Sequence, residues 1–158
     1  MLILKIEEVL KIDAKIPLSK SIIVNVLYTY GVINGTLNRV LKPFDISSQQ
    51  FNVLRILRGQ QGKPVNLGTV QDRMINKMSN TTRLIDKLVE KNLVKKSTDT
   101  VNRRKIDIRI TTEGLNFLND IDTLIDDKEV EITSQLSKKE AIELIRLLGK
   151  LRLIANAP

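Results

Sequence analysis

The feature that most constrains the fold is a change of hydrophobic period in the middle of the chain. In "MSNTTRLIDKLVEKN" the apolar residues recur at helical spacing and form one stripe, made of Leu84, Ile85, Leu88 and Val89. Ser79 is the predicted N-cap of this helix. In "KIDIRIT", a little further on, isoleucine alternates with charge, which is the period of a strand. The chain is therefore predicted to pass from a helix directly into β structure.

A second short helix is predicted just before this one. The segment "NLGTVQDRMI" has Leu67, Val70 and Met74 at helical spacing, so these three side chains are expected to point inward. About four residues separate the two helices, which fits the spacing of a helix-turn-helix. The second helix of such a pair is the one that can enter the major groove of DNA.

The β segments "LVKKST" and "KIDIRIT", joined by "DTVN", predict a β wing of two to three strands. Ile106, Ile108 and Ile110 share one face and are expected to pin the hairpin to the core. Lys105 and Arg109 lie on the other face. A helix-turn-helix followed by such a hairpin is a winged helix-turn-helix.

Helical periods continue on the N-terminal side of this unit. A short amphipathic helix is predicted over residues 2–12, and a long one opens near Ser19 and stops at "KPFD". The segment "ISSQQFNVLRILRG" predicts another helix, in which Ser47 and Gln50 have the spacing of a capping box. The fold class expected from these patterns is mainly α.

After Thr111 the period is helical again, and Ser137 with Glu140 predicts a second capping box before the last helix. The apolar faces of the terminal helices exceed what a small lobe could cover, so a homodimer is expected, with an intramolecular bundle as the alternative. The predicted division, within one compact chain, is a helical dimerisation region from both termini, residues 1–45 and 112–158, and a winged helix-turn-helix DNA-binding lobe, residues 46–111.

Charge is concentrated in the same lobe. Of a net charge of +8, a net +7 falls between Arg73 and Arg109, where eleven Lys or Arg stand against four Asp or Glu. Such an excess is the electrostatic signature of a protein that binds a polyanion. The alternative is that a basic protein simply has a basic surface.

Composition excludes several other classes. With neither Cys nor His the chain has no disulfide, Cys/His zinc site, Ser-His-Asp triad or thiol redox sensor, and no enzyme activity, cofactor or metal is expected. No apolar run approaches the length that spans a bilayer, and the start "MLILKIEEVL" carries charges where a signal peptide needs an apolar stretch. A cytoplasmic protein without membrane contact is expected.

The predicted partner is double-stranded DNA. On the second helix short polar side chains and an arginine suit base edges, while Lys87 suits phosphate. The cations of the hairpin turn suit a minor groove or its phosphates. An ordinary surface helix and a solvated turn, in which Asp99 satisfies one arginine, are the alternatives. The candidate DNA-binding residues are Ser79, Asn80, Thr82, Arg83, Lys87, Arg103, Arg104 and Lys105.

The aromatic residues suggest a second kind of partner, a small-molecule effector. Tyr28, Tyr30, Phe44 and Phe51 are candidates for lining an effector pocket, and the alternative is that each lies in the core.

Several motifs resemble the MarR family of winged-helix transcriptional regulators. They are "SNTTRLIDKLVEKNLV", "DTVNRRKIDIRIT", the following "TTEG" and "LSKKEAIELIRLLGKL", and the similarity covers roughly residues 19–153. Asp99, Arg103, Arg104 and Thr111 match the family's wing motif. Asn102 stands where the family usually has Asp.

The resemblance implies a homodimer whose terminal helices interlock and whose two lobes read the halves of a pseudo-palindromic operator. It places Ser79, Asn80 and Arg83 at the groove-facing start of the recognition helix and Arg103 at the wing tip, and makes Arg104 the partner of the wing Asp. Such proteins usually repress, and many release DNA when a small molecule acts on them. A winged-helix module that binds a partner protein, without an operator, is the alternative.

Overall fold

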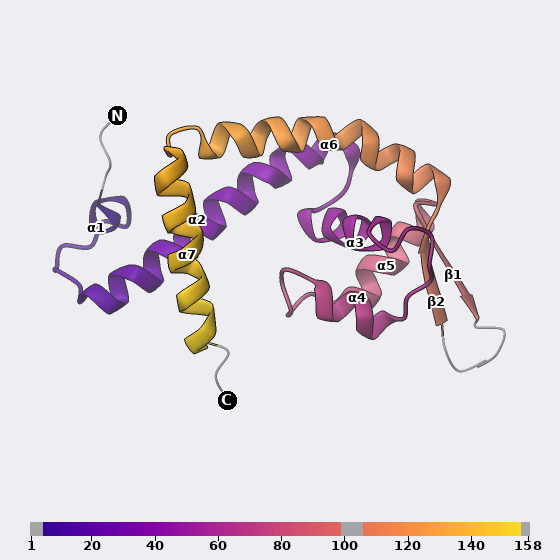
Figure 1. Ribbon diagram of the computed structural model, residues 1–158, viewed down its shortest axis with the longest axis horizontal. Helices are drawn as coiled ribbons and strands as arrows, with labels where there is room; N and C mark the ends of the chain where they lie inside the picture. The colour runs from indigo at the N-terminus through magenta and orange to yellow at the C-terminus, as the bar shows by residue number, and fades with distance from the viewer. Residues whose placement is uncertain (1–4, 99–105, 156–158) are drawn as a thin grey trace. The chain divides into compact units, whose positions relative to one another are not determined.

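The computed structural model describes residues 5–98 and 106–155, and its order of elements confirms a mainly helical winged helix-turn-helix fold. The elements are α1 (Ile6–Val9), α2 (Leu18–Leu41), the 3-10 helix η1 (Lys42–Phe44), α3 (Ser48–Arg58), α4 (Leu67–Arg73), α5 (Thr81–Glu90), β1 (Val94–Thr98), β2 (Ile106–Ile110), α6 (Thr112–Thr133) and α7 (Lys138–Ala155) (Figure 1). By compactness the chain divides into two units, Met1–Leu118 and Asn119–Pro158.

The first unit contains the lobe formed by α3, α4, α5 and the β hairpin (Figure 1). β1 and β2 pair antiparallel, with Val94 opposite Ile110 and Thr98 opposite Ile106. Val65, between α3 and α4, adds a bridge on the other side of β2, because its N–H and C=O both bond to Ile108, at 3.1 and 2.8 Å. The predicted wing is thus a two-stranded sheet extended by one bridging residue.

The core of the lobe is made by the inward faces of these elements. Leu54 and Leu57 of α3, Ile85 and Leu88 of α5 and Ile108 of β2 are all buried. Fully burying one such side chain contributes about 1.5–3 kcal/mol, so the five together hold α5 and the hairpin firmly on α3.

Two residues predicted to point inward do not. Ile106 is 52% exposed because it pairs with Thr98 at the end of the hairpin farthest from the core, so only Ile108 and the half-buried Ile110 pin the hairpin. Leu67 is 40% exposed because α4 begins there, and the inward face of α4 starts one turn later, at the buried Val70.

Of the two N-terminal helices, the first is shorter than predicted and the second has the predicted length. In the part described, the helix expected over residues 2–12 covers only Ile6–Val9, and Lys11 follows with a left-handed φ of 52°, a conformation that cannot continue a helix. The long helix α2 runs from Leu18 to Leu41 as expected. Along it Leu18, Ile23 and Leu27 are exposed in the single chain.

The hydroxyl of Thr111 anchors the start of α6. It donates to the carbonyl of Asn92 at 2.7 Å and accepts from the N–H of Gly114 at 2.9 Å. Gly114 packs so closely on the carbonyl of Leu93 that no side chain has room there. This joint fixes the first turn of α6 against the segment that leads into β1.

The second unit contains the rest of α6 and the helix α7. The predicted capping box opens α7: the N–H of Ser137 donates to Oε2 of Glu140 at 2.8 Å, and the N–H of Glu140 donates to Oγ of Ser137 at 3.3 Å. The hydroxyl of Ser137 also donates to Oε2 of Glu140 at 2.6 Å, and this bond, together with that from the Ser137 N–H, holds the pKa of the Glu140 carboxyl below its ordinary value. Ile142 and Ile145 are exposed on α7. None of the helices in the described ranges is long and apolar enough to cross a membrane.

Candidate nucleic-acid interface

The recognition helix α5 is capped by Asn80, one residue later than predicted. Oδ1 of Asn80 accepts from the N–H of Arg83 at 3.1 Å, while Oγ of Ser79 is buried and makes no hydrogen bond. Both residue types cap helices well, so the local pattern cannot choose between them. The cap leaves the Nδ2 of Asn80 available as a donor at the exposed start of α5.

Four of the five candidate residues at α5 are exposed, whereas Ser79, expected to face the groove, is half-buried. The four are Asn80, Thr82, Arg83 and Lys87, and Thr81 between them is buried, at 3% exposed. Within the described ranges neither Arg83 nor Lys87 is paired with a carboxylate. The exposed start of α5 therefore offers amide, hydroxyl and guanidinium donors, and their contact with DNA stays a prediction.

The side chain of Gln71 fixes the start of α5 from behind. Its Oε1 accepts from the hydroxyl of Thr81, and its Nε2 donates to the carbonyl of Lys77 at 2.5 Å. Oδ1 of Asn52, on α3, accepts from the N–H of Ile75 at 2.9 Å. These bonds tie α3, α4 and α5 to the turn, so the first turn of α5 has a defined position.

The hairpin is joined to α5 by an ion pair between Lys96 of β1 and Asp86. Lys96 lies on the same face of the hairpin as Ile108, its register partner. The pairing offsets the negative charge of Asp86, which lies on the outer face of α5. On the opposite face of β2, Arg109 lies 3.5 Å from Asp107 and donates to the carbonyl of Gly62 at 3.4 Å.

The wing residues that complete the predicted site lie outside the described residues. These are Arg103, Arg104 and Lys105, together with Asp99 and Asn102. Their predicted roles at the wing tip stay predictions.

A second ion pair lies at the other end of α5. The ammonium of Lys91 contacts the carboxylate of Asp45, and this hydrogen bond holds the pKa of Asp45 below its ordinary value of 3.8. Asp45 follows η1 with a left-handed φ of 52°, which Asp and Asn tolerate better than most residues. The pair connects the end of the recognition helix to the end of α2 and η1.

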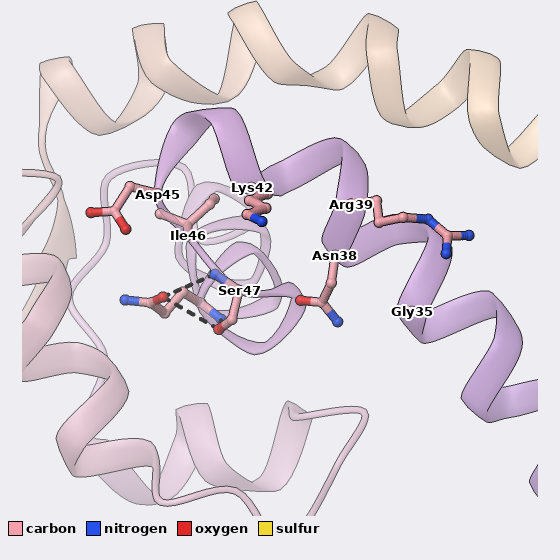
Figure 2. A pocket seen from close by; sticks show the side chains of 8 residues that line it. Gly35, Asn38, Arg39, Lys42, Asp45, Ile46 and Ser47 are labelled. Atoms are coloured by element: carbon pink, nitrogen blue, oxygen red, sulfur yellow. Dashed lines mark hydrogen bonds between the residues drawn. The ribbon is translucent and has the colours of Figure 1, made fainter.

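An open cavity of about 420 Å³ lies where α2 meets α3 (Figure 2). Two cations, Arg39 and Lys42, line it, and Ser47 and Gln50 close their capping box at its edge. A hydrogen bond links the two helices beside the cavity: the N–H of Ser48 donates to Oδ1 of Asn38 at 2.9 Å.

The aromatic residues predicted to line an effector pocket do not surround this cavity. Phe51 is buried in the core below Arg55, and Phe44 packs edge-on against Phe117 with ring centroids 6.1 Å apart. Tyr28 and Tyr30 are exposed on α2. The contact of these four residues with an effector stays a prediction.

Sequence reasoning missed the residues that position the turn, chiefly Gln71 and Asn52. Each is a polar residue on a short helix with no periodic or motif signal, and its role depends on a backbone group several to many residues away. Among the described residues no group of three or more Asp or Glu is placed to hold a metal ion.

Comparison with known proteins gives one consistent result. The sequence model of the MarR family matches residues 46–106, which is nearly the whole lobe. The regulator PecS of Dickeya dadantii (strain 3937), described as an HTH-type transcriptional regulator, is 29% identical over 75% of this chain and 72% of its own length. MgrA of Staphylococcus aureus, also an HTH-type transcriptional regulator, is 29% identical over 72% of this chain and 74% of its own length.

Solved structures agree with the sequence comparison. A mutant MarR from E. coli, complexed with operator DNA, matches with a TM-score of 0.72 and 25% identity, covering 80% of this chain and 89% of that one. The chain is therefore similar to the MarR family in the sequence of its lobe and to a MarR from E. coli in its fold.

Proposed function

We propose that this chain is a transcriptional repressor that binds double-stranded DNA as a homodimer, with α5 in the major groove of each half of a pseudo-palindromic operator. The observation that carries the proposal is the start of α5. Its exposed face presents Asn80, Thr82 and Arg83, and Gln71 fixes it from behind. A rigid helix end with outward hydrogen-bond donors is what base readout requires. The DNA complex of a MarR from E. coli supports the same use of the fold.

The proposed division of labour follows from side-chain chemistry. The Nδ2 of Asn80 and the guanidinium of Arg83 contact base edges, because they stand at the end of α5 that enters the groove. Lys87, one turn further on, contacts phosphate. At the wing Arg103 enters the minor groove, with Lys105 as a steering or phosphate contact.

The homodimer is proposed because both units leave apolar side chains exposed. Leu18, Ile23 and Leu27 on α2, and Ile142 and Ile145 on α7, are exposed in the single chain. Apolar faces of that size on terminal helices usually mark an interface. We assign residues 1–45 and 112–158 to dimerisation, residues 46–111 to DNA binding and the whole to the cytoplasm, without enzyme activity.

Regulation by a small molecule is the remaining part of the proposal. Tyr28, Tyr30, Phe44 and Phe51 are the candidates for contact with an effector that releases the DNA. Since the chain contains no cysteine, thiol oxidation is not the signal.

The decisive experiment is selection of bound duplexes from a random DNA pool by the full chain. The proposal expects an inverted repeat whose half-sites lie about one helical turn apart. A pool that stays random through successive rounds would contradict it and would favour the protein-interaction alternative.

A salt titration on the selected operator tests the mechanism. A dimer that makes about eight phosphate contacts should give a slope of log K against log salt of roughly −7. Arg103→Ala should weaken all duplexes similarly and make the slope shallower. Binding that hardly changes with salt would refute phosphate neutralisation as the source of affinity.

A further inference from the structure

The turn between α4 and α5 exposes two large apolar side chains. Ile75 is 79% exposed and Met78 is 92% exposed, although the turn is only a few residues long. Single exposed apolar residues are common on protein surfaces. These two, by contrast, stand close together in the chain, just before the start of α5.

Hydrogen bonds to the backbone of this turn keep Ile75 and Met78 exposed. The N–H of Met78 donates to Oδ1 of Asn76 at 3.0 Å, and the N–H of Ile75 donates to Oδ1 of Asn52 at 2.9 Å. The carbonyl of Lys77, between them, accepts from Gln71 at 2.5 Å. Because the backbone on both sides of each apolar residue is bonded, the turn presents these side chains to the outside.

Cations stand beside the two apolar residues along the chain. Arg73 ends α4 just before Ile75, Lys77 lies between Ile75 and Met78, and Arg83 follows in the first turn of α5, all of them exposed. A partner must therefore offer apolar groups within a strongly negative surface. The major groove of DNA does so, since the C5-methyl group of thymine stands between two rows of phosphates.

We propose that Ile75 and Met78 contact thymine methyl groups in each operator half-site and so contribute to sequence specificity. Met78 precedes the N-cap Asn80 by two residues, at the end of α5 that reaches base edges in the proposed complex. The contact makes an A·T pair better than a G·C pair beside the bases read by α5. This inference rests on the proposed function and adds apolar readout to it.

The test removes only the methyl groups. In the selected operator the thymines are replaced by uracil one position at a time, first in one half-site and then symmetrically in both. Binding of the full chain is measured by fluorescence anisotropy. Loss of one methyl contact should weaken binding about fourfold, and loss of the symmetric pair about fifteenfold. The double variant of Ile75→Ala and Met78→Ala should bind the thymine and uracil operators equally, and the two single variants identify which residue reads which position.

Lys87→Ala is the matched control. It should weaken binding to both operators and leave their affinity ratio unchanged, because it removes a phosphate contact. Thermal unfolding of the apolar variants should match the wild type, since both side chains are exposed. A uracil effect of equal size in wild type and double variant, an operator insensitive to uracil, or half-sites without thymine would each overturn the inference. Failure to select any operator would instead contradict the proposed function.

Discussion

Gly114 offers a stringent test of the joint between the hairpin and α6. A Cβ added there would lie 2.2 Å from the carbonyl oxygen of Leu93 and 2.8 Å from Cγ1 of Ile110. The Leu93 oxygen is backbone and cannot rotate away. It would have to retreat by about 0.8 Å to reach the 3.0 Å below which Cβ contacts essentially never occur. That movement strains its bond from the N–H of Thr111, now 3.1 Å long.

The expected cost of Gly114→Ala follows from these contacts. Overpacking costs about 1–3 kcal/mol. Weakening two bonds at this joint, from the Thr111 N–H to Leu93 and from the Thr111 hydroxyl to Asn92, costs about 1 kcal/mol each. The better helix propensity of alanine returns about 1 kcal/mol. The net loss of unfolding free energy should be about 2–4 kcal/mol.

Urea denaturation followed by circular dichroism measures this loss. Wild type and variant must be compared at one protein concentration, because a dimer's apparent stability depends on it. With a slope of about 2 kcal/mol per molar, the midpoint should fall by about 1.5 M. Gly59→Ala is the control: its Cβ meets only ordinary contacts at 3.4 and 3.5 Å in a right-handed helical conformation, so stability should change little or rise. A loss below about 1 kcal/mol for Gly114→Ala would refute the steric reasoning.

Three further predictions concern the recognition helix. Thr81→Val removes the buried hydroxyl that bonds Gln71 and should cost about 1–2 kcal/mol in urea denaturation; an unchanged midpoint would contradict the positioning role. Asp45→Asn removes the pairing with Lys91: since the folded pKa of Asp45 is lowered, the stability difference from wild type should be present above pH 3.8 and vanish as pH falls through the folded value, and a difference that persists in acid would exclude the charge as its cause. Arg83→Ala should cost about 1–3 kcal/mol of binding at particular base pairs, measured against single-base operator variants; equal loss on scrambled duplexes would remove its assignment to base readout.

Several elements could be predicted from short stretches of sequence because their causes are local. Ser47 with Gln50 and Ser137 with Glu140 are three residues apart, and both form the expected capping boxes. The buried stripe of α5 follows equally from spacing, with Ile85 among its most buried members. In each case the interacting groups lie within one or two helical turns.

Two predictions were wrong because the outcome depended on residues that are distant in the sequence. Ser79 and Asn80 both suit an N-cap, and packing that buries the hydroxyl of Ser79 decided for Asn80. Ile106 alternates correctly with Ile108, yet it is exposed because the hairpin extends beyond the core. An alternating pattern reports which face a side chain is on and carries no information about where the supporting layer ends.

The sequence by itself determined the succession of helices and hairpin, the excess of positive charge in the lobe and the polar outer face of α5, because period, capping and charge are properties of adjacent residues. Only the tertiary structure decided how that face is held. The bonds of Gln71 to Thr81 and Lys77, and the pairing of Asp86 with Lys96, join residues brought together by the packing of α4, α5 and β1. Such contacts depend on three-dimensional distance, which a linear pattern does not specify.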